Sequence, residues 1–304
     1  MLLYTNYEEA KNHVPYCIAL GSFDGVHIGH QKLIQTVIRK SKELNCRSMV
    51  YTFKEHPKKI LSPGTFVEMI TQNHKRIEIM SEMGIDIVYF EDFENIMKMD
   101  EETFVKDILI AKFEAKCVVV GYNFTFGNGK KGNAETLKAY GKLFGFDVQV
   151  VDAVTINGEI VSSSLIRKKI KDGQVEDIDI YLGRHYSIDG QVVRGRGNGR
   201  KIGIRTANIN INDDIVIPKP GVYLTNTFIN NKEYKSVTNI GTNPTFNGKG
   251  INIETHIIDF DGDIYYENIE IEFLKWIREE KTFNTPTELR LQIIEDINFR
   301  LNYK

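Results

Sequence analysis

The sequence predicts two domains, an α/β domain with a parallel sheet followed by an antiparallel β-barrel. Three observations lead to this fold class. The chain has 304 residues, which is long for a single hydrophobic core and suits two domains of ordinary size. Its first half alternates short apolar runs with longer segments of helical period, the rhythm of βαβ units. Its second half changes to short strands separated by turn residues.

In the first half, strand-like and helix-like segments alternate along the chain. Five apolar runs have the length of strands and are expected to form the parallel sheet: 16–20, 48–53, 85–90, 117–122 and 146–152. The longer segments of helical period between them are 30–44, 100–113 and 133–143. Because parallel strands need crossover connections, we expect these helices to cover both faces of the sheet.

In the second half, six short segments divided by turn residues are expected to form the barrel: 185–193, 206–211, 221–229, 233–241, 251–260 and 268–277. Asn230 and Asn231 are expected to make a tight hairpin turn, because asparagine tolerates positive φ better than most residues. The rhythm changes near 180–186. The two domains are therefore expected to span 1–183 and 184–304.

A helix is expected to close the chain. Thr285, Pro286 and Glu288 have the pattern of a capping box with proline at the first helical position. The apolar residues that follow recur at a spacing of four: Leu289, Ile293, Ile297 and Leu301. We expect this stripe to cover the barrel.

Composition argues against several kinds of partner and location. Asp and Glu number 41 against 39 Lys and Arg, and the net charge of −2 favours neither nucleic acid nor an acidic membrane. The N-terminal segment is acidic where a signal peptide needs a basic start, and no stretch approaches membrane-spanning length. Cys17, Cys46 and Cys117 form neither a disulfide framework nor a zinc pattern, so we interpret them as small core residues. We expect a cytoplasmic protein.

A glycine-rich turn follows the first predicted strand and leads into a helix. Its residues of interest are Gly21, Ser22, Phe23, Asp24, Gly25, His27, Gly29 and His30. Glycines let the backbone approach a phosphate, and a helix N-terminus supplies free N–H groups. The two histidines are three residues apart, so they share one helix face and can donate to the same phosphoryl group. Simple packing or capping would explain an isolated HxxH pair better, but the strand, turn and helix context favours nucleotidyl transfer.

A serine segment is a second candidate for the same site. Ser162, Ser163 and Ser164 begin a predicted helix that carries Arg167 one turn in. Hydroxyls, helix N–H groups and a guanidinium suit the β- and γ-phosphates that leave as pyrophosphate. An ordinary serine cap with a solvated basic face is the alternative, and this segment taken alone favours it.

The loop at 121–132 is a third candidate, because it follows a strand and mixes aromatic residues with glycines and lysines. It includes Asn123, Phe124 and Phe126. Such a loop can bind over an aromatic ring, and the alternative is a surface turn with one hydrophobic anchor. The residues themselves do not decide between these two interpretations.

Taken in this order, the three segments resemble the FMN adenylyltransferase domain of the bacterial bifunctional riboflavin kinase/FAD synthetases, over residues from about 14 to 184. The resemblance implies a Rossmann-like nucleotidyltransferase domain that transfers AMP from ATP to FMN. It implies catalytic roles for His27, His30 and Arg167. The glycine-rich turn and the serines would then bind ATP, and the loop at 121–132 would bind the flavin. The segment TFKEHPKK at 52–59 stands where the family has its TFxPHP loop.

The first half departs from the family pattern at four positions. Ser22 stands where Asn is usual, and Glu55 replaces a usual proline. Asn123 stands where the family loop has Asp, and Lys130 stands where Arg is usual. Because the change at Asn123 removes a charge, we assign that residue to flavin binding and not to catalysis.

A second glycine-rich segment, at 195–209, lies in the second half. Its glycines recur at a spacing of four, and Thr206 and Asn208 supply neutral oxygens that suit Mg²⁺ or its water shell. The segment resembles the GRxxGxPTAN signature of riboflavin kinase, and the similarity continues to the last helix. It implies a β-barrel kinase that uses ATP and Mg²⁺ to phosphorylate riboflavin. The residues expected to bind its nucleotide are Gly199, Arg200 and Gly203.

Kinase chemistry needs a base, because the nucleophile is a neutral primary alcohol. The resemblance implies Glu254, which lies on a predicted strand that can point it into the barrel mouth, and a surface glutamate is the alternative. Arg278 is expected to order flavin-binding loops, with a solvated strand end as the alternative. Arg205 stands where the family has proline. Without the fixed φ of proline the unfolded chain has more conformational entropy, which is expected to destabilise the folded loop by roughly 0.4–1 kcal/mol. The Arg205 side chain also offers a contact to phosphate.

Two other functions stay open on the sequence. The departures at Asn123 and Arg205 suggest a flavin- or nucleotide-binding regulator of the same fold in which one active site is impaired. Of the two active sites, the kinase site is the stronger candidate for impairment. A different adenylyl- or cytidylyltransferase joined to an unrelated barrel is the second alternative, although the TAN and ETH segments argue against it. For the bifunctional enzyme the expected small-molecule partners are riboflavin, FMN, FAD and ATP. The sequence predicts no oligomeric state.

Overall fold

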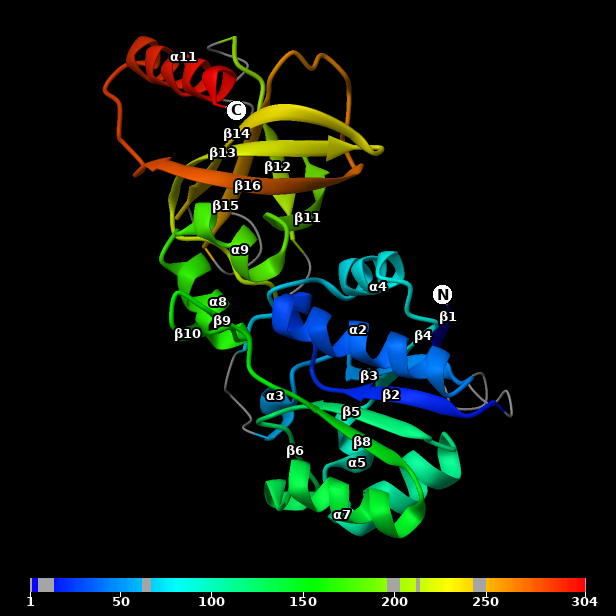
Figure 1. The fold of residues 1–304 in the computed structure, drawn as a ribbon. Helices are drawn as coiled ribbons and strands as arrows, with labels where there is room; N and C mark the ends of the chain where they lie inside the picture. The colour runs from blue at the N-terminus through cyan, green and yellow to red at the C-terminus, as the bar shows by residue number, and fades with distance from the viewer. Residues whose placement is uncertain are drawn as a thin grey trace. The chain divides into compact units, whose positions relative to one another are not determined.

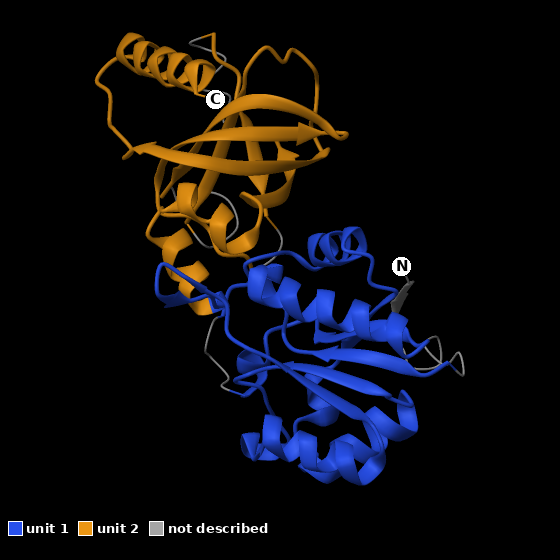
Figure 2. Ribbon diagram, in the orientation of Figure 1, with its two compact units in different colours: residues 1–163 blue, residues 164–304 orange. Residues whose placement is uncertain are grey.

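The computed structural model describes residues 2–4, 14–61, 67–195, 203–211, 214–242 and 250–303. The chain divides into two compact units, residues 1–163 and 164–304 (Figure 2). Unit 1 is built on a parallel sheet and unit 2 on a closed antiparallel barrel (Figure 1), which confirms the predicted fold class. Within the described ranges, no helix is both long enough and apolar enough to cross a membrane.

The sheet of unit 1 has six strands in the order β1-β4-β3-β2-β5-β8, and every neighbouring pair is parallel. The strands are β1 (Leu2–Tyr4), β2 (Tyr16–Leu20), β3 (Arg47–Phe53), β4 (Ile87–Glu91), β5 (Cys117–Gly121) and β8 (Asp147–Val151). The five strands expected from the apolar runs are all present. The sequence analysis missed β1, which is three residues long and joins the edge of the sheet beside β4.

Two cores lie on the two faces of this sheet, because successive side chains of a strand point to opposite faces. On one face, side chains such as Cys17 and Ala19 pack against helix α2 (Ile28–Glu43) and helix α4 (Asn73–Glu82). On the other, side chains such as Ile18 and Leu20 pack against helix η2 (Phe104–Lys112) and helix α7 (Ala134–Phe144). The expected two-sided covering is therefore confirmed.

Two helices differ from the expectation. The segment expected as one helix at 100–113 begins as α6 (Glu101–Thr103) and continues as the π-helix η2, in which Phe113 N–H donates to Ile108 O. Helix α4 was not predicted, because its sequence is rich in polar residues and buries only Arg76 and Met80. Helices are predicted from apolar residues that recur with helical period, and this segment has too few of them.

The barrel of unit 2 closes in the order β11-β12-β15-β14-β13-β16. Its strands are β11 (Tyr186–Val193), β12 (Ala207–Asn210), β13 (Gly221–Ile229), β14 (Lys232–Gly241), β15 (Asn252–Ile257) and β16 (Asn268–Arg278). All six expected segments are present. Asn230 and Asn231 both have positive φ, 49° and 64°, which confirms the tight turn between β13 and β14.

The barrel interior is filled by aromatic residues and by a buried chain of hydroxyl groups. Tyr186 and Tyr223 pack on Phe273 with ring centroids 6.0 and 5.3 Å away. Thr225 Oγ1 lies 2.9 Å from Thr238 Oγ1, which donates to Thr255 Oγ1 at 2.9 Å. These contacts identify the interior face of each strand, so the alternate residues of β15 lie on the outer face.

Helix α11 (Pro286–Asn302) closes the chain, with Thr285 as its cap: Thr285 Oγ1 accepts from Glu288 N at 3.2 Å. The predicted start is thus confirmed. The predicted apolar stripe is only partly right, because the buried residues of the helix are Asp296 and Arg300 and Leu301 is 45% exposed. Arg300 donates to Thr225 O at 2.9 Å, so polar contacts bind this helix to the barrel.

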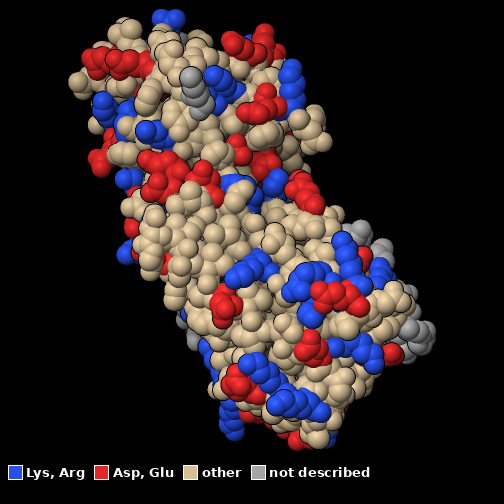
Figure 3. Space-filling model, in the orientation of Figure 1, with Lys and Arg blue, Asp and Glu red and all other residues tan. Residues whose placement is uncertain are grey.

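The remaining elements are short. Unit 1 includes η1 (Asp24–Val26), α3 (Pro57–Leu61), α5 (Phe93–Ile96), β6 (Thr125–Phe126), η3 (Asn128–Lys130), β7 (Gly132–Asn133), β9 (Thr155–Ile156) and β10 (Glu159–Ile160). The two units join within α8 (Ser163–Lys171), and η4 (Val175–Asp177) and α9 (Asp179–Leu182) precede the barrel. The domain boundary expected at 183/184 stays a prediction. Lysine, arginine, aspartate and glutamate side chains are interspersed on the face shown in Figure 3, with no broad field of one sign.

Candidate functional sites

The glycine-rich turn of unit 1 brings its two histidines into direct contact. His27 caps helix α2, and its Nδ1 accepts from the backbone N–H of His30 at 3.2 Å. The two rings stack with centroids 3.6 Å apart and planes inclined by 15°. Because Nδ1 of His27 accepts, this ring carries its proton on Nε2 and can donate from there. A Cβ on Gly29 would stand 3.1 Å from the His27 ring, so glycine makes room for it.

His30 is held as a neutral imidazole. Its pKa lies well below the usual histidine value, chiefly because burial disfavours the charged form and secondarily because of charge repulsion from His27, whenever that ring is protonated, and from the Arg76 guanidinium. His30 Nδ1 is buried without a hydrogen-bond partner in the described structure. Buried polar atoms are normally paired, so an unpaired ring nitrogen marks this turn as a candidate functional site.

The same turn contacts the serine segment, which lies about 140 residues further along the chain. Ser163 Oγ donates to Asp24 O at 2.9 Å. The Asp24 carboxylate is fully buried and accepts from Ile70 N at 2.8 Å. Asp24 therefore shapes the turn in this structure, and its predicted nucleotide contact stays a prediction. Phe23 is likewise buried, with its ring centroid 5.1 Å from that of His30.

Arg76 on α4 is a residue of this site that sequence reasoning missed. Its guanidinium is fully buried and donates to Ser22 O at 2.7 Å, Thr52 Oγ1 at 2.7 Å and Phe53 O at 3.0 Å. It thereby joins the end of β2 to the end of β3. Burial lowers its pKa to about 10, so it stays a cation at neutral pH. No sequence signal marked it, because an arginine on a polar helix is normally solvated.

The loop after β5 packs Phe124 and Phe126 against the core. Phe124 and Phe126 stack with centroids 5.7 Å apart, and Phe126 also contacts Phe104 of η2 at 5.6 Å. Asn123 is exposed beside them. The loop is therefore a partly buried aromatic surface with one exposed amide at the carboxyl end of a parallel strand, where ligands of open α/β sheets bind.

Helix α8 begins at Ser163, as the serine segment predicts. Ser162 is half-buried, Ser164 is exposed and Arg167 is half-buried on the next turn. A helix N-terminus with hydroxyl groups favours anions. The roles of these residues toward a nucleotide stay predictions.

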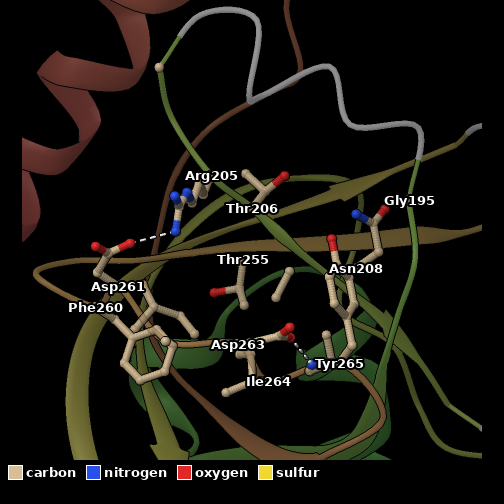
Figure 4. A pocket seen from close by; sticks show the side chains of 15 residues that line it. Gly195, Arg205, Thr206, Asn208, Thr255, Phe260, Asp261, Asp263, Ile264 and Tyr265 are labelled. Carbon is tan, nitrogen blue, oxygen red and sulfur yellow. Dashed lines mark hydrogen bonds and ion pairs between the residues drawn. The ribbon is translucent and has the colours of Figure 1, made fainter.

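Unit 2 contains a cavity of about 770 Å³ that includes the expected metal residues (Figure 4). Thr206 and Asn208 line it together with Gly195 and Gly203. A Cβ on Gly195 would stand only 2.2 Å from the Asn208 amide, so glycine at this position lets Asn208 lie against the backbone. The predicted nucleotide residues Gly199 and Arg200 lie outside the described residues.

The expected base lies beside this cavity. Strand register places Glu254 of β15 directly opposite Asn208 of β12 on one side and Asn239 of β14 on the other. Asn252 Nδ2 donates to Glu254 Oε1 at 2.7 Å. The strand pattern predicts that Glu254 can point into the barrel mouth. In the structure Glu254 lies on the outer face, because the alternate residues Ile253 and Thr255 are buried in the interior.

Arg278 is not a solvated strand end. Its Nε and Nη2 donate to the two carboxylate oxygens of Asp296 on α11, at 3.0 and 2.6 Å. The side chains are only 16% and 5% exposed. Arg278 therefore ties the end of β16 to the last helix. Asp296, its partner, was missed because it stands inside the predicted apolar stripe.

Within the described ranges, no group of three or more His, Cys, Asp or Glu side chains is arranged to hold a metal ion. The cavity of unit 2 nevertheless combines Thr206 and Asn208 with the carboxylates of Asp261 and Asp263. Such an oxygen set suits Mg²⁺, which is usually bound by one or two carboxylates together with substrate phosphates and water.

Two family profiles match the chain in succession. The profile of FAD synthetase matches residues 9–165, and the profile of riboflavin kinase matches residues 182–303. A bifunctional riboflavin kinase/FMN adenylyltransferase of Listeria monocytogenes is 34% identical over 284 residues, covering 92% of this chain and 89% of that protein. The protein of the same name from Bacillus subtilis is 33% identical over 303 residues, covering 97% and 93%.

A solved structure also shares the whole fold. The chain matches a crystal structure described as a macrolide-efflux protein from Streptococcus pneumoniae with a TM-score of 0.91 and 31% sequence identity. The match covers 100% of this chain and 99% of that chain. The two units therefore occur together, in this order, in a solved structure.

Proposed function

The chain belongs to the bifunctional riboflavin kinase/FMN adenylyltransferase family, and on that premise we propose that it makes FAD from riboflavin in two ATP-dependent steps. Unit 2 phosphorylates riboflavin to FMN, and unit 1 adenylylates FMN to FAD with release of pyrophosphate. The observation that carries the proposal is that the described structure contains a candidate site in each unit: the stacked histidines of the glycine-rich turn, and the cavity that Thr206 and Asn208 line. The domains are proposed to span 1–183 and 184–304.

In the adenylylation step, the nucleophile is the phosphate of FMN, which is already anionic. No strong base is needed, so the protein's task is to align the reactants and to stabilise charge on the α-phosphate of ATP. His27 and His30 donate to that phosphate, and Gly21, Ser22 and Gly29 let the nucleotide approach the turn. Arg76 supports them by fixing the Ser22 carbonyl.

The leaving pyrophosphate and the flavin are assigned to the other two candidate segments of the domain proposed to span 1–183. Ser162, Ser163, Ser164 and Arg167 bind the β- and γ-phosphates, with support from the contact between Ser163 and the glycine-rich turn. The flavin ring lies against the aromatic loop of Asn123, Phe124 and Phe126.

In the kinase step, Glu254 accepts the proton of the ribityl hydroxyl as the γ-phosphoryl group moves. Its position opposite Asn208 supports this role, because Asn208 lines the cavity proposed to receive the phosphates. Thr206 and Asn208 would hold Mg²⁺, and the ion would supply neutralisation of phosphate charge. Arg278 holds α11 on the barrel and so orders the flavin side of this site.

A cytoplasmic location is also proposed. All three cysteines are free, and Cys17 and Cys117 lie directly opposite one another on β2 and β5. Adjacent free thiols are characteristic of a reducing compartment. Secretion with the Cys17 and Cys117 thiols oxidised would contradict this proposal, and thiol labelling of freshly lysed cells measures it.

The experiment that tests the function is incubation of the purified chain with riboflavin, ATP and Mg²⁺, followed by chromatographic separation of the flavins. FMN that appears first and is then converted to FAD supports both activities. FAD formed only from supplied FMN would show that the kinase half is inactive. Absence of both products would contradict the proposal and would favour a flavin-binding regulator of the same fold.

A further inference from the structure

Arg205 occupies a position at the cavity of unit 2 that the proposed kinase reaction does not yet use. The cavity is lined by segment 203–208, which leads into β12, and by segment 260–265, which follows β15 (Figure 4). Among the described residues that line it, Arg205 is the single cation, whereas Asp261 and Asp263 are carboxylates. A nucleotide polyphosphate entering this cavity therefore meets one complementary side chain in the described part of the wall.

The guanidinium of Arg205 is paired with the Asp261 carboxylate, so the pair joins the two segments that form the cavity wall. Both side chains are well exposed, Arg205 at 66% and Asp261 at 88%. Exposed ion pairs contribute little to stability, because water and salt screen them and two flexible side chains lose entropy. The guanidinium can therefore leave Asp261 for a stronger partner at small cost.

The backbone of Arg205, in contrast, is well fixed. His256 Nδ1 donates to Arg205 O at 2.7 Å, and two residues later Ala207 pairs with Thr255 in the barrel. The backbone of Arg205 therefore stays in position while its guanidinium can exchange Asp261 for another anionic partner. Thr206 and Asn208, the proposed Mg²⁺ residues, follow in the same segment, so the guanidinium projects from the part of the wall where phosphates are expected.

Resting on the proposed kinase function, we propose that Arg205 is a phosphate-binding residue of this site. In the free protein its guanidinium is held by Asp261, and when a nucleoside triphosphate binds it pairs with phosphate oxygens. Phosphate is the better partner because it offers two oxygens with more negative charge to the planar guanidinium. Arg205 then positions the triphosphate for attack by the ribityl hydroxyl, whose proton Glu254 accepts.

The experiment compares R205A and R205P with wild type in the full chain. R205P restores the residue of the family signature and keeps the carbonyl that His256 binds, but it lacks the cation. The matched control is R39A, because Arg39 is similarly exposed and pairs with Glu43 on α2 of unit 1. We expect both Arg205 variants to raise the KM for ATP in FMN formation roughly tenfold. The KM for riboflavin and the rate of FAD formation from FMN should stay unchanged, and R39A should change none of these.

Calorimetric titration with ATP and Mg²⁺ separates this inference from the proposed function. If wild type forms no FMN, the proposed function fails, yet the titration still reports on Arg205. A roughly tenfold weakening of one of two ATP-binding steps in R205A and R205P supports the phosphate role. Unchanged ATP binding, or an equal rise in the KM values for ATP and riboflavin, would overturn it.

Discussion

The two units hold their candidate sites in different ways. In unit 1, two hydrogen bonds hold the glycine-rich turn: the fully buried Arg76 donates to Ser22 O, and Ser163 donates to Asp24 O. His30 is neutral before any ligand binds. In unit 2, Glu254 lies on the outer face of a strand, and the charged pair at the cavity is exposed. A site fixed by buried contacts is preorganised, whereas a site with exposed charged groups can rearrange when its ligand arrives.

The comparison predicts that the two activities separate cleanly by mutation. His30→Ala should lower the rate of FAD formation from FMN by about 10²–10³-fold, because an oriented donor to the phosphate is lost. Glu254→Ala should lower the rate of FMN formation by about 10²–10⁴-fold, because the base is lost. Each variant is assayed with both substrates.

Loss of both activities in either single variant, shown to be folded by circular dichroism, would contradict the assignment of one activity to each unit. His256→Ala serves as a control for Glu254, because it lies on the same face of β15 two residues away. Its rate of FMN formation should exceed that of the Glu254 variant by at least about tenfold.

Loss of one buried cation should destabilise the unit to which it belongs. Arg76→Met leaves the carbonyl oxygens of Ser22 and Phe53 without their charged donor, and Arg278→Met leaves the Asp296 carboxylate buried without its cation. We expect each change to cost about 3 kcal/mol of unfolding free energy. Each should lower only the activity of its own unit.

Urea unfolding measures both costs. Trp276 is the only tryptophan of the chain and lies on β16, so its fluorescence reports on unit 2. Circular dichroism adds the transition of unit 1. Arg76→Lys and Arg278→Lys are the matched controls, and they should recover part of the loss because the charge is kept without the planar fork. If Trp276 fluorescence shifted as much in Arg76→Met as in Arg278→Met, the units would not be independent.

The neutral state of His30 makes a prediction about pH. Because its folded pKa lies well below the unfolded value near 6.5, the unfolded chain binds more protons than the folded chain as pH falls below that value. The stability of unit 1 should then decrease by up to about 1.4 kcal/mol per pH unit, and this contribution is fully present above pH 6.5. Urea unfolding at pH 7 and pH 5.5 measures the slope. His30→Gln should reduce the slope of the unfolding free energy against pH. An unchanged slope in this variant would show that other titratable groups cause the pH dependence.

The smallest expected effects concern one strained backbone position in each unit. Glu114 follows η2 with φ of 47°, and Tyr266 lies before β16 with φ of 68°. Both side chains are exposed, and left-handed backbone is unfavourable for residues with a Cβ. Glu114→Gly and Tyr266→Gly should each stabilise their unit by about 1 kcal/mol, measured by thermal unfolding. Lys130→Gly is a further case, because it has φ of 58° in an exposed loop. A loss of stability in all three would show that the side chains make contacts that outweigh the strain.

Most of the fold was predictable, because period-two and helical patterns record which side chains are buried. The five strands at 16–152, the six barrel strands and the cap at Thr285 all follow from such patterns. Helix α4 and strand β1 were not predictable, because one buries few apolar side chains and the other is three residues long. The polar attachment of α11 was missed because Asp296 and Arg300 are buried by pairing, which has no signature in the apolar pattern.

Local patterns in the sequence predicted the fold class and the two glycine-rich segments, and the family resemblance added residues such as Glu254 that no local pattern singles out. Which distant residues meet depends on the tertiary structure. The tertiary structure forms the hydrogen bonds of Ser163 with Asp24 and of Arg76 with Ser22, and the ion pairs of Arg278 with Asp296 and of Arg205 with Asp261. The physical reason is that these contacts form between segments far apart in the chain, and their partners are selected by sheet register and helix packing, which no local pattern contains.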